Sequence, residues 1–291
     1  MRLMKKTILL LFLFFYGVNL FAQENESVRF EFIPAGLHIL PLKANYQEAR
    51  VGVLYYSDNG DLKVDMGNNI DVIAFHFPKI NGKLTVGAEF MAYALSTSYQ
   101  GNRLQIDAVD GFFGGNISFS KKFSSDRFMA KLRFIHNSAH LVDGHYQLDS
   151  LQWMNGDQPI PFTRNFFELQ IAHQFYLPFG SIKFYGAVSY STLVRPHDLE
   201  RLSAFFGYEL AYGVGKVFEK DANLFVAQQL TGIGSPRYIM NNNMMGGIKF
   251  GDWDGKGIVL YLSYYIGANP LSEYYYERVE RFGAGFFLDF F

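Results

Sequence analysis

The sequence contains no cysteine, which excludes disulfide bonds and thiolate metal ligands. After residue 22 it also has no apolar run that could cross a bilayer as a helix, which takes about 20 residues. Basic residues are not in excess. Residues 1–22 hold three of the 26 Lys and Arg and none of the 27 Asp and Glu, so the remainder has 23 basic against 27 acidic residues and a net charge of −4. That balance gives no basic footprint for nucleic acid. Phosphate-loop, zinc and dinucleotide motifs are missing too.

Aromatic residues are abundant instead, at 18% of the chain, with 31 Phe and 19 Tyr. The last eleven residues alternate strictly, which is a strand signal. One face carries Phe282, Ala284, Phe286, Leu288 and Phe290, and the other carries Gly283, Gly285, Phe287 and Asp289. An apolar row opposite a small or polar row is what a membrane barrel wall needs, and aromatic side chains form its interfacial girdles. A soluble edge strand would look similar, but it would not explain the rest of the chain.

The N-terminus is typical of a secretory signal peptide. Arg2, Lys5 and Lys6 precede an apolar core at residues 7–18, and Ala22 offers a small residue for cleavage. We therefore expect a signal peptide at 1–22 rather than an uncleaved anchor, because no stop-transfer pattern follows. No cysteine follows the apolar core, so a lipoprotein is excluded. At the other end, Phe291 is the expected docking signal for the barrel-assembly machinery.

Strand periodicity predicts an all-β fold: a transmembrane antiparallel β-barrel of about twelve strands at residues 49–291. From the second connection on, short turns alternate with longer loops, although the loop after the third strand is only slightly longer; the first connection, at 58–61, is a short exception. Short connections are periplasmic in bacterial outer-membrane barrels. We place residues 23–48 before the wall as a periplasmic arm or plug, because Pro34 and Pro41 disfavour regular wall strands. The oligomeric state stays open. The expected strands are 49–57, 62–77, 84–98, 103–123, 127–141, 163–177, 182–194, 203–218, 223–232, 243–252, 257–267 and 280–291.

The alternation also assigns faces within this barrel. On 127–141, one face points toward lipid and the other toward the lumen. The lipid face carries Phe128, Ala130, Leu132 and Phe134, and the lumen face carries Met129, Lys131 and Arg133. Four further charged residues fall on lumen faces, and we expect opposite charges to pair in a narrow barrel: Glu89, Lys183, Glu209 and Lys249.

One segment breaks the apolar row. Continuing the lipid-facing parity beyond Phe134 reaches His136, Ser138 and His140, near the outer end of the strand. Residues two apart on a strand share a face about 6–7 Å apart, a spacing that lets an imidazole reach a hydroxyl. On the next strand, Asn165 is the first lipid-facing residue and could hydrogen-bond the far ring nitrogen of His136. Polar residues are also common where strands leave a membrane, so an interfacial role is the alternative.

Two acids on the other neighbouring strand lie at the same height. Asp107 keeps the lipid-facing parity, and Asp110 would reach that face through a bulge near Gly111. No cofactor is predicted, although Asp143, Asp149 and Asp157 could offer oxygen ligands to calcium.

Short segments of the sequence resemble those of known outer-membrane families. Residues 136–143, His-Asn-Ser-Ala-His-Leu-Val-Asp, resemble the His-x-Ser-Ser-His-Leu-Gly-Asp signature of an outer-membrane family, domain of unknown function 1207. Residues 41–45, Pro-Leu-Lys-Ala-Asn, are similar to that family's Pro-Leu-x-Ala-Asp. Ala108-Val109-Asp110-Gly111 stands where the family shows Ala-Asp-Tyr. This resemblance implies the fold and an outer-membrane location.

The second resemblance is to outer-membrane phospholipase A and lipid A 3-O-deacylase. Those barrels carry a His-x-Ser pair on one lipid face and an Asn or acid on a neighbouring strand. His136, Ser138 and Asn165 match by type, although Ala139-His140 replaces the phospholipase's Asn-Gly. The resemblance implies a lipid acyl hydrolase with outer-membrane lipids as partners. We therefore expect an outer-membrane barrel of the first family, with the hydrolase as one alternative and a narrow porin or structural barrel as another.

Overall fold

The computed structural model describes residues 28–99, 103–147, 149–156, 158–234 and 238–290. The expected signal peptide, residues 1–22, and the expected docking residue Phe291 lie outside this part. The described elements are β-strands and short 3-10 turns. Within these ranges, no helix is long and apolar enough to cross a membrane.

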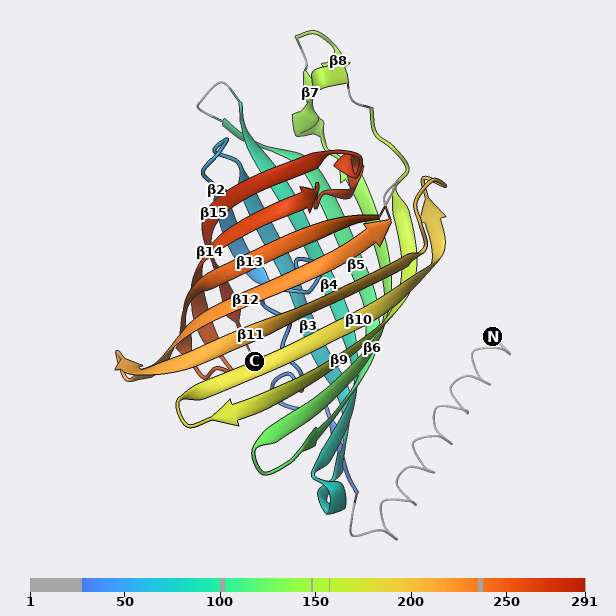
Figure 1. Cartoon of the computed structure of the whole chain (residues 1–291). Helices are drawn as coiled ribbons and strands as arrows, with labels where there is room; N and C mark the ends of the chain where they lie inside the picture. Colours follow the sequence, from blue (N-terminus) through green and yellow to red (C-terminus); the bar gives the residue numbers. More distant parts are fainter. Residues whose placement is uncertain (1–27, 100–102, 148, 157, 235–237, 291) are drawn as a thin grey trace, which may run out of the picture.

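Twelve antiparallel strands form a closed barrel, as predicted (Figure 1). Each strand pairs with the next along the chain, and the last, β15, pairs with the first, β2, through Leu288 opposite Val51. Closure leaves the wall without a free edge. The wall strands are β2 (Val51–Tyr56), β3 (Leu62–Phe77), β4 (Gly82–Tyr99), β5 (Arg103–Lys122), β6 (Asp126–Leu141), β9 (Thr163–Leu177), β10 (Gly180–Arg195), β11 (Leu202–Val217), β12 (Lys220–Gly234), β13 (Tyr238–Gly251), β14 (Gly257–Ala268) and β15 (Arg278–Asp289).

The two ends of the barrel differ. At the turn end the connections are 78–81, 123–125, 178–179, 218–219 and 252–256. At the loop end, the longest connection (142–162) carries a small hairpin of β7 (Tyr146–Gln147) and β8 (Gln152–Trp153). The 269–277 loop at the same end holds the 3-10 turn η4 (Ser272–Tyr274).

One expected loop at this end is wrong. The sequence suggested a connection at 233–242, but β12 and β13 extend into it and leave only 235–237 between them. Asn241, Asn242 and Asn243 resemble turn residues, yet they pair with β12. The side chains of Asn241 and Asn243 are buried. Asparagine is uncommon in the strands of soluble proteins, but polar residues are common on the lumen-facing side of a membrane barrel.

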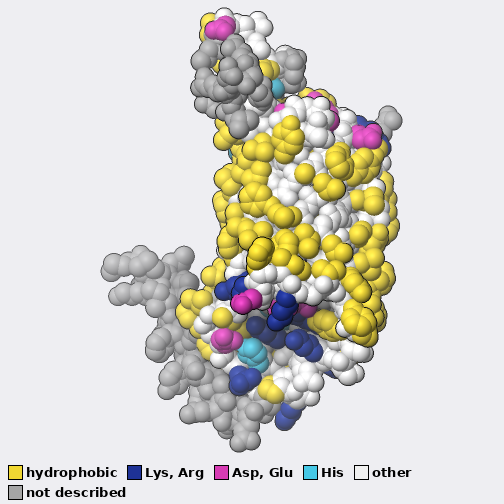
Figure 2. Space-filling view, turned by 90° about the vertical axis from the view of Figure 1, so that its left-hand side faces the viewer, with side chains coloured by type: hydrophobic (Ala, Val, Ile, Leu, Met, Phe, Trp, Pro, Cys, Tyr) yellow, Lys and Arg dark blue, Asp and Glu magenta, His cyan; other side chains and the backbone are white. Residues whose placement is uncertain are grey.

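The outer face is apolar. Leu132 and Phe134 of β6 and Leu169 of β9 are each more than 40% exposed. Their neighbours in sequence, Arg133 and Glu168, are buried inside the barrel. Figure 2 shows hydrophobic side chains covering the middle of the wall, with Lys and Arg gathered toward the turn end. The predicted assignment of faces on β6 is thus confirmed.

The segment before the wall, for which the sequence left an arm and a plug open, starts with a strand that the sequence did not indicate. β1 (Arg29–Phe32) pairs with the turn-end half of β3, from Arg29 opposite His76 to Phe32 opposite Ile73. β2 pairs with the loop-end half of the same strand. The chain between them enters the barrel, where Leu42, Ala44 and Glu48 are buried. We call residues 33–50 the plug.

Charged side chains tie the plug to the wall. Lys43 Nζ lies 2.7 Å from Asp289, and Glu48 accepts a hydrogen bond from Gln170 at 2.8 Å. Wall residues on adjacent strands also pair with each other on the lumen side. Lys183 bonds Glu209 at 2.9 Å, as expected.

Two of the four lumen-facing charged residues named in the sequence analysis pair with residues outside that set of four. Glu89 is held by Arg133 at 2.8 Å, and Lys249 by Asp289 at 2.6 Å. Buried charges need such partners because desolvation is costly.

Candidate active site

Strand β6 carries the candidate residues on its outer face. His136 and Ser138 are partly exposed and His140 is exposed. The intervening Ile135, Asn137 and Ala139 are at most 1% exposed and face inward. Strand alternation therefore places the three polar side chains in one row, outward of the apolar residue Phe134.

Neighbouring strands hold the His136 ring from both sides. On β9, Asn165 lies opposite His136, and its Oδ1 accepts a hydrogen bond from His136 Nδ1 at 2.6 Å. On β5, Phe113 lies opposite, with ring centroids 4.7 Å apart. The expected cross-strand hydrogen bond is therefore present. It fixes the tautomer that protonates Nδ1 and leaves Nε2 as a proton acceptor.

Ser138 has a more open environment. Its cross-strand neighbours are Gly111 on β5 and Thr163 on β9. A Cβ at Gly111 would stand 3.8 Å from Ser138 Oγ and would meet nothing outside Ser138 within 4 Å. Glycine thus leaves a side-chain-sized space beside the hydroxyl. Across the described residues, no hydrogen bond joins Ser138 Oγ to His136. Such bonds are often long in ligand-free enzymes and tighten with substrate.

The prediction that Asp107 faces lipid is wrong. The β4–β5 register shifts at this point, pairing Leu95 with Ala108 and Ser96 with Ile106. This bulge turns Asp107 into the barrel, where it bonds His145 Nδ1 at 2.5 Å and the Tyr274 hydroxyl at 2.6 Å. A buried carboxylate gains more from two donors than from a lipid-facing position.

Asp110 was expected to reach the lipid face through a bulge near Gly111, and it does not. The pairing runs without a shift from Ala108 opposite Leu141 to Lys122 opposite Arg127, so Asp110 keeps its lumen parity. It is fully buried, and Ser272 donates to it from both its backbone and its hydroxyl. Neither acid can orient His136, which leaves that position to Asn165.

His140 continues the row beyond Ser138, opposite Val109 of β5. The structure thus brings together His136, Ser138, His140 and Asn165. The sequence did not identify Phe113 or Gly111 as part of the site. The unshifted β5–β6 pairing, counted from the short turn at 123–125, would have indicated both.

Two of the three suggested calcium ligands fall outside the described residues: Asp157 and the side chain of Asp143. Among the residues that the structure does describe, no three His, Asp or Glu side chains gather as a metal site.

Comparisons with known proteins bear on the fold. No protein-family model matches the sequence, and no curated protein matches it. Solved outer-membrane barrels do match. Outer membrane phospholipase A from Escherichia coli aligns with a TM-score of 0.50 and 11% identity, covering 84% of this chain and 93% of that one. The beta domain of the Bordetella autotransporter BrkA aligns with a TM-score of 0.42 and 11% identity, covering 82% of this chain and 96% of that one. OmpT of Vibrio cholerae aligns with a TM-score of 0.39 and 7% identity, covering 91% of this chain and 99% of that one. The chain is an outer-membrane-type β-barrel.

Proposed function

We propose that this protein is an outer-membrane acyl hydrolase acting on ester-linked lipids, with a Ser138–His136–Asn165 site on its membrane face. The observation that carries the proposal is the 2.6 Å hydrogen bond from His136 Nδ1 to Asn165. It holds an imidazole on the outer face two residues from a serine, in the tautomer that a general base needs.

The chemistry follows from these positions. Ser138 Oγ attacks the ester carbonyl carbon while its proton passes to His136 Nε2. Collapse of the tetrahedral intermediate breaks the ester bond, and the departing alcohol takes that proton. Water then attacks the acyl-serine, giving its proton to His136. Collapse of this second intermediate breaks the acyl–serine bond, the Ser138 oxygen takes the proton back from His136, and the fatty acid leaves.

The height of the site suits this substrate. Phe134 and Phe167, just inward of the site toward the middle of the wall, are 45% and 48% exposed. His140, toward the loop end, is exposed and polar. Ester linkages lie between acyl chains and headgroups, at the interfacial depth where apolar residues give way to polar ones. The space at Gly111 admits the carbonyl group beside Ser138.

The lumen favours this reading over a porin. Residues of the plug lie inside the barrel, and Arg133 reaches both Glu89 and Glu168 and the carbonyl of Gln47. A lumen crossed by such contacts favours function on the outer surface. The signature at 136–143 supports placing the chain beside the domain of unknown function 1207 family in the bacterial outer membrane.

The test is fatty-acid release from phospholipid or lipid A in mixed micelles by the purified, folded barrel. We expect Ser138→Ala and His136→Ala to abolish it. His173→Ala is the matched control. His173 also carries a polar partner, Asp126 at 2.9 Å, but it lies at the turn end. No release from any ester-linked lipid, or release that survives Ser138→Ala, would refute the proposal.

A further inference from the structure

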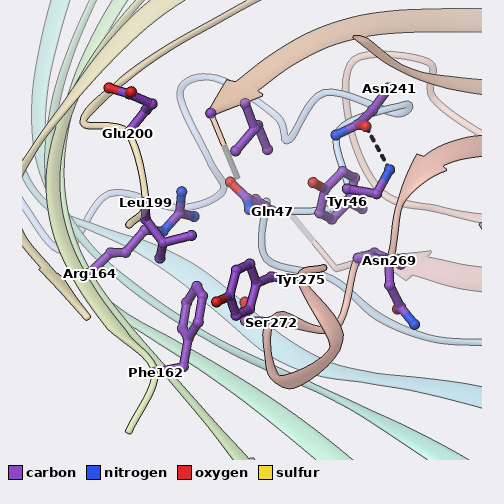
Figure 3. Close-up of a pocket in the computed structure, with 14 residues that line it drawn as sticks. Tyr46, Gln47, Phe162, Arg164, Leu199, Glu200, Asn241, Asn269, Ser272 and Tyr275 are labelled. Carbon is purple, nitrogen blue, oxygen red and sulfur yellow. Dashed lines mark hydrogen bonds between the residues drawn. The ribbon is translucent and has the colours of Figure 1, made fainter. Parts of the chain in front are cut away.

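A pocket opens inside the barrel near its loop end, on the opposite side of the wall from Ser138. It has a volume of about 440 Å³ including its open mouth. The plug supplies Gln47, β9 supplies Arg164, and the 269–277 loop supplies Tyr275 (Figure 3). Because Arg164 and Asn165 are adjacent on β9, they face opposite sides of the wall. The pocket is therefore separate from the proposed hydrolase site.

Arg164 is the unusual residue in this pocket. Its side chain is buried, with the residue only 8% exposed. Its guanidinium carbon lies 5.9 Å from the Phe162 ring centroid and 5.5 Å from that of Phe166. Throughout the described ranges, no protein oxygen accepts a hydrogen bond from it, and its Nε is buried without a partner.

Other buried basic residues of this barrel behave differently. Arg133 is held by Glu89 and Glu168, and Lys183 by Glu209. Asp110, which also lies near the loop end, is occupied by Ser272. The Arg164 guanidinium interacts electrostatically with the Asp110 carboxylate but makes no hydrogen bond to it. Its planar fork of N–H donors therefore remains for another acceptor, and that fork matches a carboxylate or phosphate.

A second donor points to the same kind of ligand. Asn241 is 2% exposed and lines the pocket. Its Oδ1 accepts the backbone N–H of Ala268 at 2.8 Å, drawn as a dashed line in Figure 3. Its Nδ2 is buried and has no partner in the described chain. Buried donors are rarely left unsatisfied. Glu200 also lines the pocket, but its carboxylate accepts from neither donor, so the two donors indicate an acceptor that is not part of the protein.

We infer that this pocket binds a small polar organic anion through its carboxylate or phosphate group, with Arg164 as the anchor. Gln47 and Asn241 line the same pocket, and their side-chain amides suit polar groups of such a ligand. The inference does not depend on the proposed hydrolase activity, because neither Ser138 nor His136 lines the pocket.

The experiment is calorimetric titration of the full-length, detergent-folded barrel with three probes: glucuronate, glucose 1-phosphate and glucose. We expect one or both anions to bind and glucose not to bind. Comparing the two anions identifies the preferred acceptor group. Binding should be unchanged in Ser138→Ala.

Variants then test the anchor. Arg164→Gln should weaken anion binding at least tenfold, and Arg164→Lys should restore only part of it, because lysine lacks the fork. Arg195→Gln is the control, since Arg195 is exposed near the same end of the barrel and bonds its own neighbours. Asn241→Asp keeps the acceptor for Ala268 and should also weaken binding. It serves as the second test if Arg164→Gln fails to fold. Failure of both anions to bind the wild type, or full binding by Arg164→Gln or by Asn241→Asp, would overturn the inference.

Discussion

Asn165 Oδ1 accepts a hydrogen bond from His136 Nδ1 at 2.6 Å across the β6–β9 pair, on the membrane-facing side of the wall. This contact joins two polar side chains on an otherwise apolar surface, and it leaves His136 Nε2 free to take a proton. Several consequences of this geometry can be measured.

The Asn165 side chain should tune the base rather than take part in bond formation. Asn165→Ala should lower fatty-acid release by less than the loss of the base, whose contribution is about 10²–10⁴-fold. Asn165→Asp keeps an oxygen that accepts from Nδ1 and should retain more activity than Asn165→Ala. Kinetics in mixed micelles, with the folded state checked by heat-modifiable migration, measures both. Equal loss in both variants would count against an orienting role.

Arg133 should be essential to the stability of the folded barrel. It holds Glu89 and Glu168 at 2.8 Å each while 2% exposed. Removing one partner of a buried ion pair leaves an uncompensated charge, so Arg133→Ala should lower the free energy of unfolding by about 3–5 kcal/mol. Urea-induced unfolding in detergent or vesicles provides the measurement. Lys216→Ala is the control, because Lys216 is exposed near the turn end. A similar free energy of unfolding for both variants would contradict the stabilising role of the Arg133 ion pairs.

Loop closure at the mouth should depend on pH. Burial, and then the nearby Asp110, raise the pKa of Glu273 to about 7 from its usual 4.5. Its Oε2 accepts the N–H of Ile160 at 3.0 Å, which ties the 269–277 loop to the 142–162 loop. The folded state therefore holds this proton more tightly than the open loop does. Closure should be strongest below about pH 5 and weaken as the pH rises through 7.

Hydrogen exchange of residues 269–277 between pH 5 and 8.5 measures this closure. Exchange, corrected for its intrinsic pH dependence, should rise over that range in the wild type and stay nearly constant in Glu273→Gln. Asp107, His145 and Asp110 lie in the same region, so a rise that persists in Glu273→Gln would assign the effect to one of them.

Accessibility should distinguish the two ends of the barrel. Protease added to intact cells should cut in the 142–162 loop, which projects beyond the wall (Figure 1). The 269–277 loop should resist, because Ser272, Glu273 and Tyr274 are buried. Cleavage at 123–125 in intact cells would reverse the orientation of the barrel.

The wall was largely predictable because strand alternation is a local property. The range 62–77 coincides with β3, and the outward row from Phe128 to His140 follows from counting by two. The Asn165–His136 contact was predictable for the same reason. That prediction required only the alternation on each strand and the fact that β6 ends and β9 begins at the same end of the barrel.

The remaining features depend on non-local contacts. The bulge at Asp107 is set by what the side chain meets inside the barrel, His145 and Tyr274, which are distant in sequence. The Asn241–Asn243 run resembles a turn until its lumen environment is known. Residues 33–50 enter the barrel because their charges find partners on strands far along the chain, such as Asp289 for Lys43. A single sequence carries no local signal for such pairings.

The most direct measurement of the central claim is covalent labelling of the folded barrel with a serine-reactive alkyl sulfonyl fluoride, followed by mass spectrometry of the peptides. The account predicts modification of Ser138 in the wild type and in His173→Ala, and its loss in His136→Ala, because only the His136-activated hydroxyl is nucleophilic enough to react. An unmodified Ser138 in the wild type, or equal labelling in His136→Ala, would contradict the assignment of this site as a hydrolase.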